Sequence, residues 1–130
     1  MRGNIARFEI PPLDPSNPEK LRAGILLFNS GDFFKAHEVW EEIWLVAAEP
    51  EKTFLQGLIQ LAAAFHHYSR GNRNGAQSLI AAALTKLEKF PDSCGGVNLA
   101  ALRLAVHQWL TSPLNRPACV PLPAPQIRCI

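Results

Sequence analysis

Apolar residues along this chain recur every three or four positions, a spacing that places them on one face of an α-helix. In the first such stretch Leu21, Ile25 and Phe28 follow an Asn-Pro pair and precede Ser30. Asparagine followed by proline is typical of a helix start, and glycine is typical of a helix end. The whole pattern predicts five helices, whose expected limits are Asn17 to Ser30, Asp32 to about Ala47, about Lys52 to Ser69, Asn72 to before Pro91, and Asn98 to before Pro113.

The third predicted helix is expected to be the most buried. Its apolar residues, from Phe54 to Phe65, point in most directions around the axis, whereas those of a surface helix form one stripe. A short loop around Glu49 and Pro50 joins it to the second helix, so these two helices should be antiparallel. The sequence therefore predicts an all-α fold, a compact bundle of about five helices built from antiparallel αα-hairpins. Residues 17–112 form this bundle domain, residues 1–16 an extended arm, and residues 113–130 a proline-rich tail.

A strip of polar residues runs along the otherwise apolar third helix. Gln56, Gln60 and His67 lie four and seven positions apart, so they share a narrow arc of the helix surface. A polar group buried without a hydrogen-bond partner costs roughly 1–3 kcal/mol. Partners for this strip are therefore expected on a neighbouring helix.

The second helix offers such partners at the border of its apolar face. His37 and Glu41 lie four positions apart, with Glu38 closer to solvent. In an antiparallel pair, His37 falls level with about Ala62 and Glu41 with about Leu58. The predicted site between the two helices is therefore the polar cluster His37, Glu38, Glu41, Gln56, Gln60 and His67.

Three interpretations of this cluster remain open. It can be a purely structural network, in which His37 is held by Glu41 and the glutamines satisfy nearby carbonyls. It can be a metal site, with His37, Glu41 and His67 as three ligands of a divalent ion such as zinc, iron or manganese. It can also bind an organic ligand or form a metal-free acid/base pair.

Composition and charge narrow the classes of function. Apolar residues make up 48% of the chain and charged residues 18%, which is typical of a globular protein. The net charge is +2 and the basic residues are scattered, so no nucleic-acid-binding surface is expected. No signal-peptide pattern and no stretch near ~20 apolar residues occurs, and we expect a cytoplasmic protein that does not enter the membrane.

Cysteine and aromatic content add two expectations. Cys94, Cys119 and Cys129 show no metal-binding spacing and are expected to be reduced thiols. The chain has three tryptophans and seven phenylalanines, a large apolar content for so few helices to cover. We therefore expect a homo-oligomer, most simply a dimer.

Two segments of the sequence resemble a known family. The first runs from Phe28 to Trp44 and reads FNSGDFFKAHEVWEEIW, and the second runs from Phe54 to His67 and reads FLQGLIQLAAAFHH, followed by Arg70-Gly71-Asn72 and Gly75-Ala76. In this order and spacing they resemble domain-of-unknown-function family 309, over about residues 20–90. The resemblance implies a bacterial or archaeal all-α bundle and carries no activity. It also implies that the family's polar positions fall on the six residues of the cluster.

His66 departs from the family's pattern, because an aromatic or aliphatic residue is common at that position. Its helical position directs it toward the arc of Leu55, Ile59 and Ala62, so we interpret it as a core or interface histidine. His67 is the better match for the site.

The sequence leads to a main hypothesis and an alternative. The main hypothesis is a non-catalytic binding or assembly module, with a protein or small-molecule partner that the sequence does not identify. The alternative is a metal-dependent or acid/base hydrolase that uses the same cluster.

Overall fold

The computed structural model describes residues 13–111 and 124–130. Over these residues the chain forms the helices α1 (Pro18–Asn29), α2 (Phe33–Trp44), α3 (Glu51–Ser69), α4 (Arg73–Leu87) and α5 (Leu99–Thr111), and the short strands β1 (Ser93–Cys94) and β2 (Val97–Asn98). The predicted all-α bundle is confirmed, and the small hairpin was not expected. None of the described helices is both long enough and apolar enough to cross a membrane.

Local signals set the ends of several helices. The Asn17 side chain accepts a hydrogen bond from Lys20 N at 3.1 Å, and Asn72 caps α4 in the same way by accepting from Gly75 N at 3.0 Å. Gly31 and Gly71 end the preceding turns with φ angles of 90° and 85°, a conformation that other residues rarely adopt. The signals at Asn17, Asn72, Gly31 and Gly71 therefore act as predicted, whereas Asp32 begins α2 without a side-chain cap hydrogen bond.

Helix α2 ends at Trp44, earlier than the expected limit near Ala47. The following residues tighten into a turn, in which Val46 N bonds to Ile43 O at 3.2 Å and Ala47 N to Trp44 O at 3.3 Å. The Lys52 ammonium also donates to Trp44 O at 2.7 Å and lies 3.9 Å from the centroid of the indole ring. Trp44 O therefore accepts from Lys52 and from Ala47 N. In a continuing helix it would accept from the backbone N–H four residues later.

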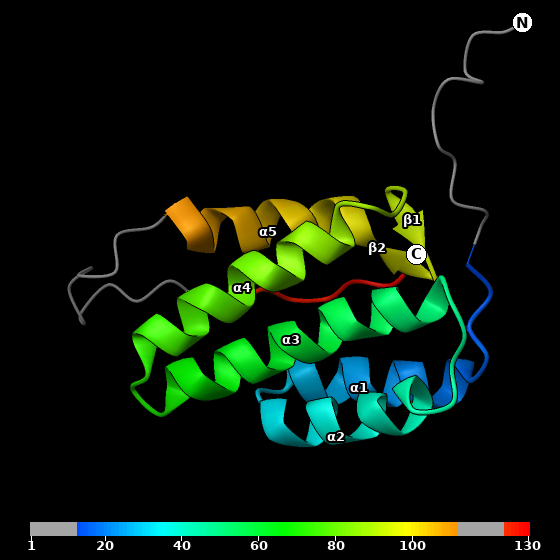
Figure 1. Cartoon of the computed structure of the whole chain (residues 1–130), viewed down its shortest axis with the longest axis horizontal. Coiled ribbons are helices and arrows are strands. Elements are labelled where there is room, and N and C mark those ends of the chain that lie inside the picture. The colour runs from blue at the N-terminus through cyan, green and yellow to red at the C-terminus, as the bar shows by residue number, and fades with distance from the viewer. Residues whose placement is uncertain (1–12, 112–123) are drawn as a thin grey trace, which may run out of the picture.

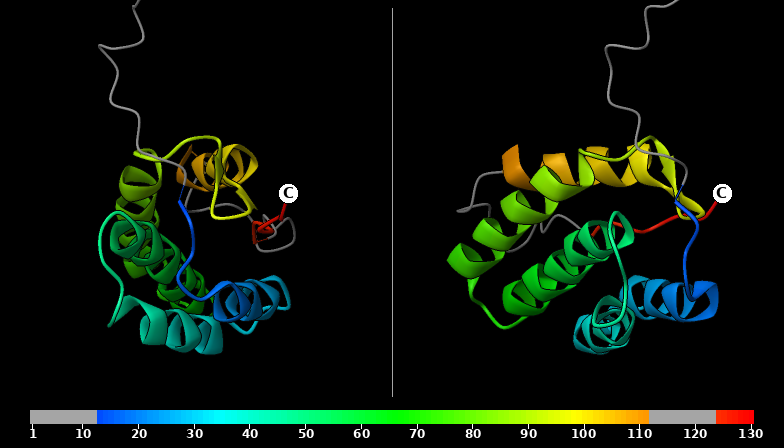
Figure 2. Two further views of the ribbon diagram at one scale, coloured as in Figure 1. Left: turned by 90° about the vertical axis from the view of Figure 1, so that its right-hand side faces the viewer. Right: turned by 45° about the vertical axis from the view of Figure 1, so that its right-hand side comes forward.

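The five helices follow one another around an arc, each packed against the next (Figure 1). Seen nearly end-on, α1 and α2 lie on one side, α5 lies on the other, and α3 and α4 connect them (Figure 2). Helix α3 is the central element, as expected, and its fully buried residues include Phe54, Leu58 and Phe65. Trp40 of α2 joins the same core with no exposed surface.

The C-terminal segment lies in the opening of this arc between α1 and α5 (Figure 2). Residues 124–130 are extended, as expected for the tail, and they pack against the bundle through Ile127, which is 2% exposed. Strand β2 pairs with β1 on one side and with this segment on the other, through an isolated bridge between Val97 and Cys129. Cys94 and Cys129 are free thiols, and Cys119 lies outside the described residues.

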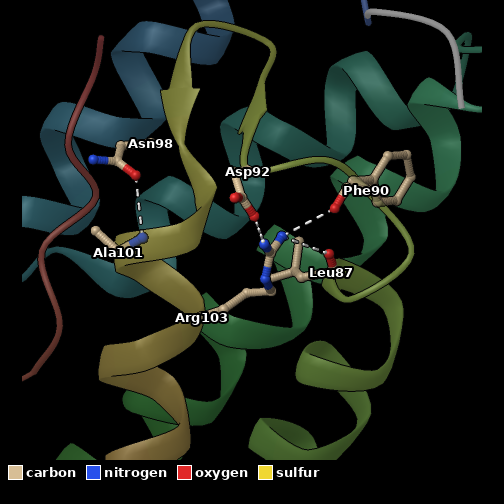
Figure 3. Close-up of polar contacts among 6 residues, drawn as sticks. All are labelled: Leu87, Phe90, Asp92, Asn98, Ala101 and Arg103. Atoms are coloured by element: carbon tan, nitrogen blue, oxygen red, sulfur yellow. Dashed lines mark hydrogen bonds and ion pairs between the residues drawn. The ribbon is translucent and has the colours of Figure 1, made fainter. Parts of the chain in front are cut away.

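Arg103 joins three parts of the chain where α4 ends and α5 begins. Its guanidinium donates to Phe90 O at 3.0 Å and to Leu87 O at 3.4 Å, and it pairs with the Asp92 carboxylate (Figure 3). The carbonyls at the end of a helix have no partner within it. Arg103 therefore caps α4 and holds the loop that leads to the hairpin.

Candidate functional site

Helices α2 and α3 lie side by side and antiparallel, so the start of α2 is level with the end of α3 (Figure 1). A cleft of about 200 Å³ opens there, lined by Phe34, His37, Ala63, His66 and His67. Ala63 has the smallest side chain of these and leaves the space between the rings. The antiparallel pairing thus brings His37 and His67 to one cleft.

His37 extends from α2 and contacts Glu41 one turn later. Its Nε2 atom lies 3.4 Å from Glu41 Oε2, and the two side chains are 26% and 49% exposed. In the neutral tautomer that carries its proton on Nε2, beside this carboxylate, Nδ1 is an acceptor, whereas in the charged ring both nitrogens are donors. That Nδ1 atom is buried and has no hydrogen-bond partner in the part of the chain that the structure describes.

Gln60 is the second group of this kind. Its Oε1 atom is buried and has no hydrogen-bond partner among residues 13–111 and 124–130. Gln60 precedes Ala63 by three positions, so both share one face of α3. The strip of α3 that borders the cleft therefore includes a second acceptor without a partner.

His67 is fixed at the end of α3 by the cap of the next helix. Asn72 Oδ1 accepts from Gly75 N, so its amide nitrogen faces His67 Nδ1 at 3.2 Å. An amide NH₂ group can only donate, and the proton of neutral His67 therefore resides on Nε2. This ring presents a donor on the side away from Asn72.

Of the two interpretations of His66, core or interface, the structure contradicts the core position. This residue is partly exposed, lines the cleft, and lies against Phe34 with the ring centroids 5.3 Å apart. Phe34 was missed altogether, although an aromatic residue on the polar side of an amphipathic helix is a recognisable signal. It is 49% exposed and also contacts the His37 ring, at 5.8 Å between centroids.

Of the six predicted residues, only His37 and His67 line the cleft, and Glu41 and Gln60 lie beside it on the same helices. Glu38 is exposed on α2 and does not line the cleft. Gln56 borders a separate cleft of about 170 Å³, whose lining also includes Trp44, Glu49, Lys52, Thr53 and Lys86. The polar strip of α3 is thus divided between two small clefts.

The residues proposed as metal ligands do not form a ligand set. Among the described residues, no group of three or more His, Cys, Asp or Glu side chains is placed to hold a metal ion. His37 and Glu41 are close to each other, but His67 is directed by Asn72. This arrangement does not fit a metal centre with three protein ligands.

Known proteins share a family match with part of the chain, and their descriptions name no activity. The model of the family described as Domain of unknown function (DUF309) matches residues 21–79. An uncharacterized protein of Aquifex aeolicus (strain VF5) is 34% identical over 93 residues, which are 71% of this chain and 28% of that protein. The uncharacterized protein YpuF of Bacillus subtilis (strain 168) is 38% identical over 58 residues, which are 44% of this chain and 33% of that protein.

The match therefore spans a third or less of the length of these relatives. The family match contains both segments on which the resemblance was based, from the middle of α1 into α4. Residues 21–79 of the chain therefore match the family described as Domain of unknown function (DUF309).

Proposed function

We propose that this chain is a non-catalytic binding module whose α2–α3 cleft holds an ammonium or guanidinium group of a partner molecule. The observation that carries this proposal is the pair of buried acceptors, His37 Nδ1 and Gln60 Oε1, that have no partner among the described residues. A buried acceptor without a hydrogen bond is costly. A donor-rich group is the chemical complement of two such atoms.

The size of the cleft favours a single chemical group over a whole metabolite. Its volume of about 200 Å³ is below the ~300–1,000 Å³ typical of pockets that enclose drug-sized ligands. A lysine or arginine side chain fits this space. The partner is therefore proposed to be a protein or peptide that presents such a side chain.

The surroundings of the cleft favour a cation. The face of Phe34 is exposed at the rim, and aromatic faces attract cations. Glu41 contributes a carboxylate that is half exposed and already in contact with His37. A cation entering the cleft would contact the Phe34 and His37 rings that line it, with Glu41 and Gln60 on the same two helices beside the cleft.

Small probes test the proposal directly. Methylguanidinium and propylammonium are titrated into the ¹⁵N-labelled full chain, with acetate as the anionic control, and the amide signals of Phe34, His37 and Gln60 are followed by NMR. We expect saturable shifts at these positions with the cations alone. The shifts should disappear in Gln60→Leu and persist in Gln56→Leu, which alters the other cleft. Equal shifts with acetate, or cation shifts unchanged in Gln60→Leu, would contradict the proposal.

The alternative function is an acid/base hydrolase, and the 3.4 Å contact between His37 Nε2 and Glu41 Oε2 favours it. A histidine oriented by a carboxylate can activate water as a general base. The test is hydrolysis of an activated ester such as p-nitrophenyl acetate by the wild-type chain, His37→Gln and Glu41→Gln. Turnover that falls in both variants while their melting temperatures hold would support catalysis over binding.

We also propose that the chain is a cytoplasmic homodimer that does not bind nucleic acid. Large apolar side chains are exposed outside the cleft, among them Leu26, Leu45, Val46 and Leu104 at 64–83%, and such surfaces often mediate association. Sedimentation velocity at micromolar concentration should show a species with the mass of two chains. A single species with the mass of one chain would remove the dimer from the proposal.

A further inference from the structure

The C-terminal segment is bound to the bundle in the way that a peptide is bound in a groove. In the end-on view it occupies the opening between α1 and α5, and it ends beside β2 (Figures 1 and 2). It lies beside Asn29 of α1, 98 residues away in the sequence from Ile127. The contact therefore joins the C-terminal segment to the end of α1.

The Asn29 side chain recognises the backbone of this segment, and the Asn29 main-chain oxygen also accepts from Gln126 Nε2 at 3.2 Å. The side-chain Nδ2 of Asn29 donates to Ile127 O at 2.8 Å, and its Oδ1 accepts from Ile127 N at 2.8 Å. These two bonds are the pair that a neighbouring strand would make. The side-chain amide of Asn29 thus takes the place of a strand partner.

The other edge of the segment is recognised by the backbone of the hairpin. Asn98 N donates to Arg128 O at 2.8 Å, and Ile130 N donates to Gly96 O at 2.9 Å. The segment therefore lies along the free edge of β2 and joins it through an isolated bridge, and the pairing of an extended peptide with a sheet edge is a common mode of peptide recognition.

Side chains of residues 125–128 alternate between the groove and solvent, whereas Cys129 and Ile130 are both exposed. Pro125 and Ile127 are buried, whereas Gln126 and Arg128 are exposed. A period of two is the pattern of a strand with one buried face. The groove thus accepts an extended backbone with apolar side chains two positions apart.

These contacts do not require that the groove and the segment belong to one copy of the chain. Residues 112–123 connect α5 to the segment and include Pro113, Pro117, Pro121 and Pro123. At about 3.3 Å per residue this connection can reach roughly 40 Å, whereas the 13 residues of α5 that it must retrace are about 20 Å long. The connection has length to spare for reaching a neighbouring molecule.

We propose that the groove formed by Asn29, the β2 edge and the flanking helices is a peptide-binding site, and that residues 124–130 of a second copy occupy it when two chains associate. Within a single chain, residues 124–130 occupy the groove of that same chain. Exchange between copies preserves each of the contacts described above, and reciprocal exchange of this kind produces closed dimers at little cost.

Two full-length variants that damage opposite sides of the contact test the exchange. Ile127→Asp damages the segment and leaves the groove intact, whereas Asn29→Ala damages the groove and leaves the segment intact. When the two are mixed, the segment of the Asn29→Ala chain can enter the groove of the Ile127→Asp chain. We expect a heterodimer in the mixture, and we expect each variant alone to remain at the mass of one chain, by light scattering after size exclusion.

The matched control is the Ile127→Asp chain mixed with the double variant Asn29→Ala/Ile127→Asp, which offers no intact segment. This mixture should contain no heterodimer. Circular dichroism first checks that each variant keeps its helices, and Ile127→Ala and Asn29→Ser replace any variant that does not. Absence of the heterodimer from the first mixture, or its presence in the control, would overturn the proposal.

A synthetic peptide of residues 121–130, with serine in place of Cys129, provides an independent measurement. We expect it to bind the full-length Ile127→Asp chain, and to bind the double variant roughly tenfold more weakly or worse. A peptide carrying Ile127→Asp should not bind. Equal binding to the two chains would show that Asn29 does not form the site.

Discussion

At the scale of single residues, the closest packing lies between α1 and α2 at Gly24. A Cβ atom at this position would collide with the indole nitrogen of Trp40. Trp40 has no exposed surface, and its Nε1 donates to Leu21 O at 3.1 Å. The indole cannot move away without losing both its packing and this bond. Gly24 is therefore required by the contact with its neighbour and not by its own backbone conformation.

We expect Gly24→Ala to lower the free energy of unfolding by about 3 kcal/mol, because overpacking adds to the loss of a buried hydrogen bond. Urea denaturation followed by tryptophan fluorescence measures this change. Gly57→Ala is the matched control, since its added Cβ would meet Leu87 Cδ2 at 2.8 Å, the flexible end of a side chain. Gly57→Ala should lower the free energy of unfolding by less than half as much as Gly24→Ala. Equal losses would contradict the explanation that the rigid Trp40 indole makes Gly24 necessary.

Gln60 links stability to the proposed function at the same scale. Its buried Oε1 has no partner among the described residues, so Gln60→Leu should raise the free energy of unfolding by up to about 1–2 kcal/mol. Gln77→Leu is the control, because Gln77 Nε2 donates to Leu110 O at 3.4 Å and its replacement removes a bond. Thermal melts compare the two variants. Strong destabilisation by Gln60→Leu would indicate a structural role for this glutamine.

At the scale of elements, the junction between α4 and α5 depends on Arg103 (Figure 3). Replacing it by methionine keeps an unbranched but shorter side chain. It removes the side-chain donor of Phe90 O and Asp92 and leaves Leu87 O with Phe90 N alone. We expect Arg103→Met to cost about 2 kcal/mol of stability. Lys89→Met removes an exposed charge on the same stretch and should change stability by less than about 0.5 kcal/mol. Similar melting temperatures for the two variants would contradict this role.

The hairpin introduces a dependence on alkaline pH through Cys94. Burial raises the pKa of this thiol from its ordinary 9.0 to about 11, and the charge of Arg103 lowers it in part. Below about pH 9 the thiol is protonated in both the folded and the unfolded chain. Between pH 9 and 11 the unfolded chain releases this proton while the folded chain keeps it, so the linkage lowers stability as the pH rises.

We expect the free energy of unfolding to fall between pH 8.5 and 11 more steeply in the wild-type chain than in Cys94→Ala, with a difference on the order of 2 kcal/mol at the upper limit. Urea titrations at several pH values, in the presence of a reductant, measure the two slopes. Other groups that titrate in this range contribute equally to both chains. Parallel curves would show that Cys94 is not the cause.

At the scale of the whole molecule, the C-terminal segment closes the arc of helices by its contact with the end of α1. Ile127 is 2% exposed, and its backbone is held by Asn29. Ile127→Ala should lower the free energy of unfolding by about 2–4 kcal/mol, as is usual for truncation of a buried aliphatic side chain. Ile130→Ala is the control in the same segment, since Ile130 is 76% exposed. Chemical denaturation should find that control within about 0.5 kcal/mol of the wild type.

Much of the fold could be predicted from the sequence because its signals are local. The spacing of Leu21, Ile25 and Phe28 and the caps at Asn17 and Asn72 act over a few residues, and the helices begin and end close to the expected positions. The antiparallel pairing of α2 and α3 followed from their short loop. It correctly brought His37 and His67 to one cleft.

The composition of the cleft depended on tertiary structure. His66 was assigned to the core or an interface from its helical position, and in the structure it lines the cleft against Phe34 of α2. Glu38 and Gln56 share helix faces with the site and yet lie outside it. Periodicity gives the direction of a side chain to within tens of degrees, whereas membership of a small cleft depends on a few ångströms.

The sequence by itself determined the five helices, their order and the polar strip of α3, because hydrogen bonds and apolar faces within a helix involve residues close in the chain. Tertiary structure alone decided that Arg103 caps α4, that a hairpin forms between α4 and α5, and that Ile127 reaches Asn29. These pairings join residues 13 to 98 positions apart, except within the hairpin. Their geometry exists only after the helices have packed, and no local pattern specifies it.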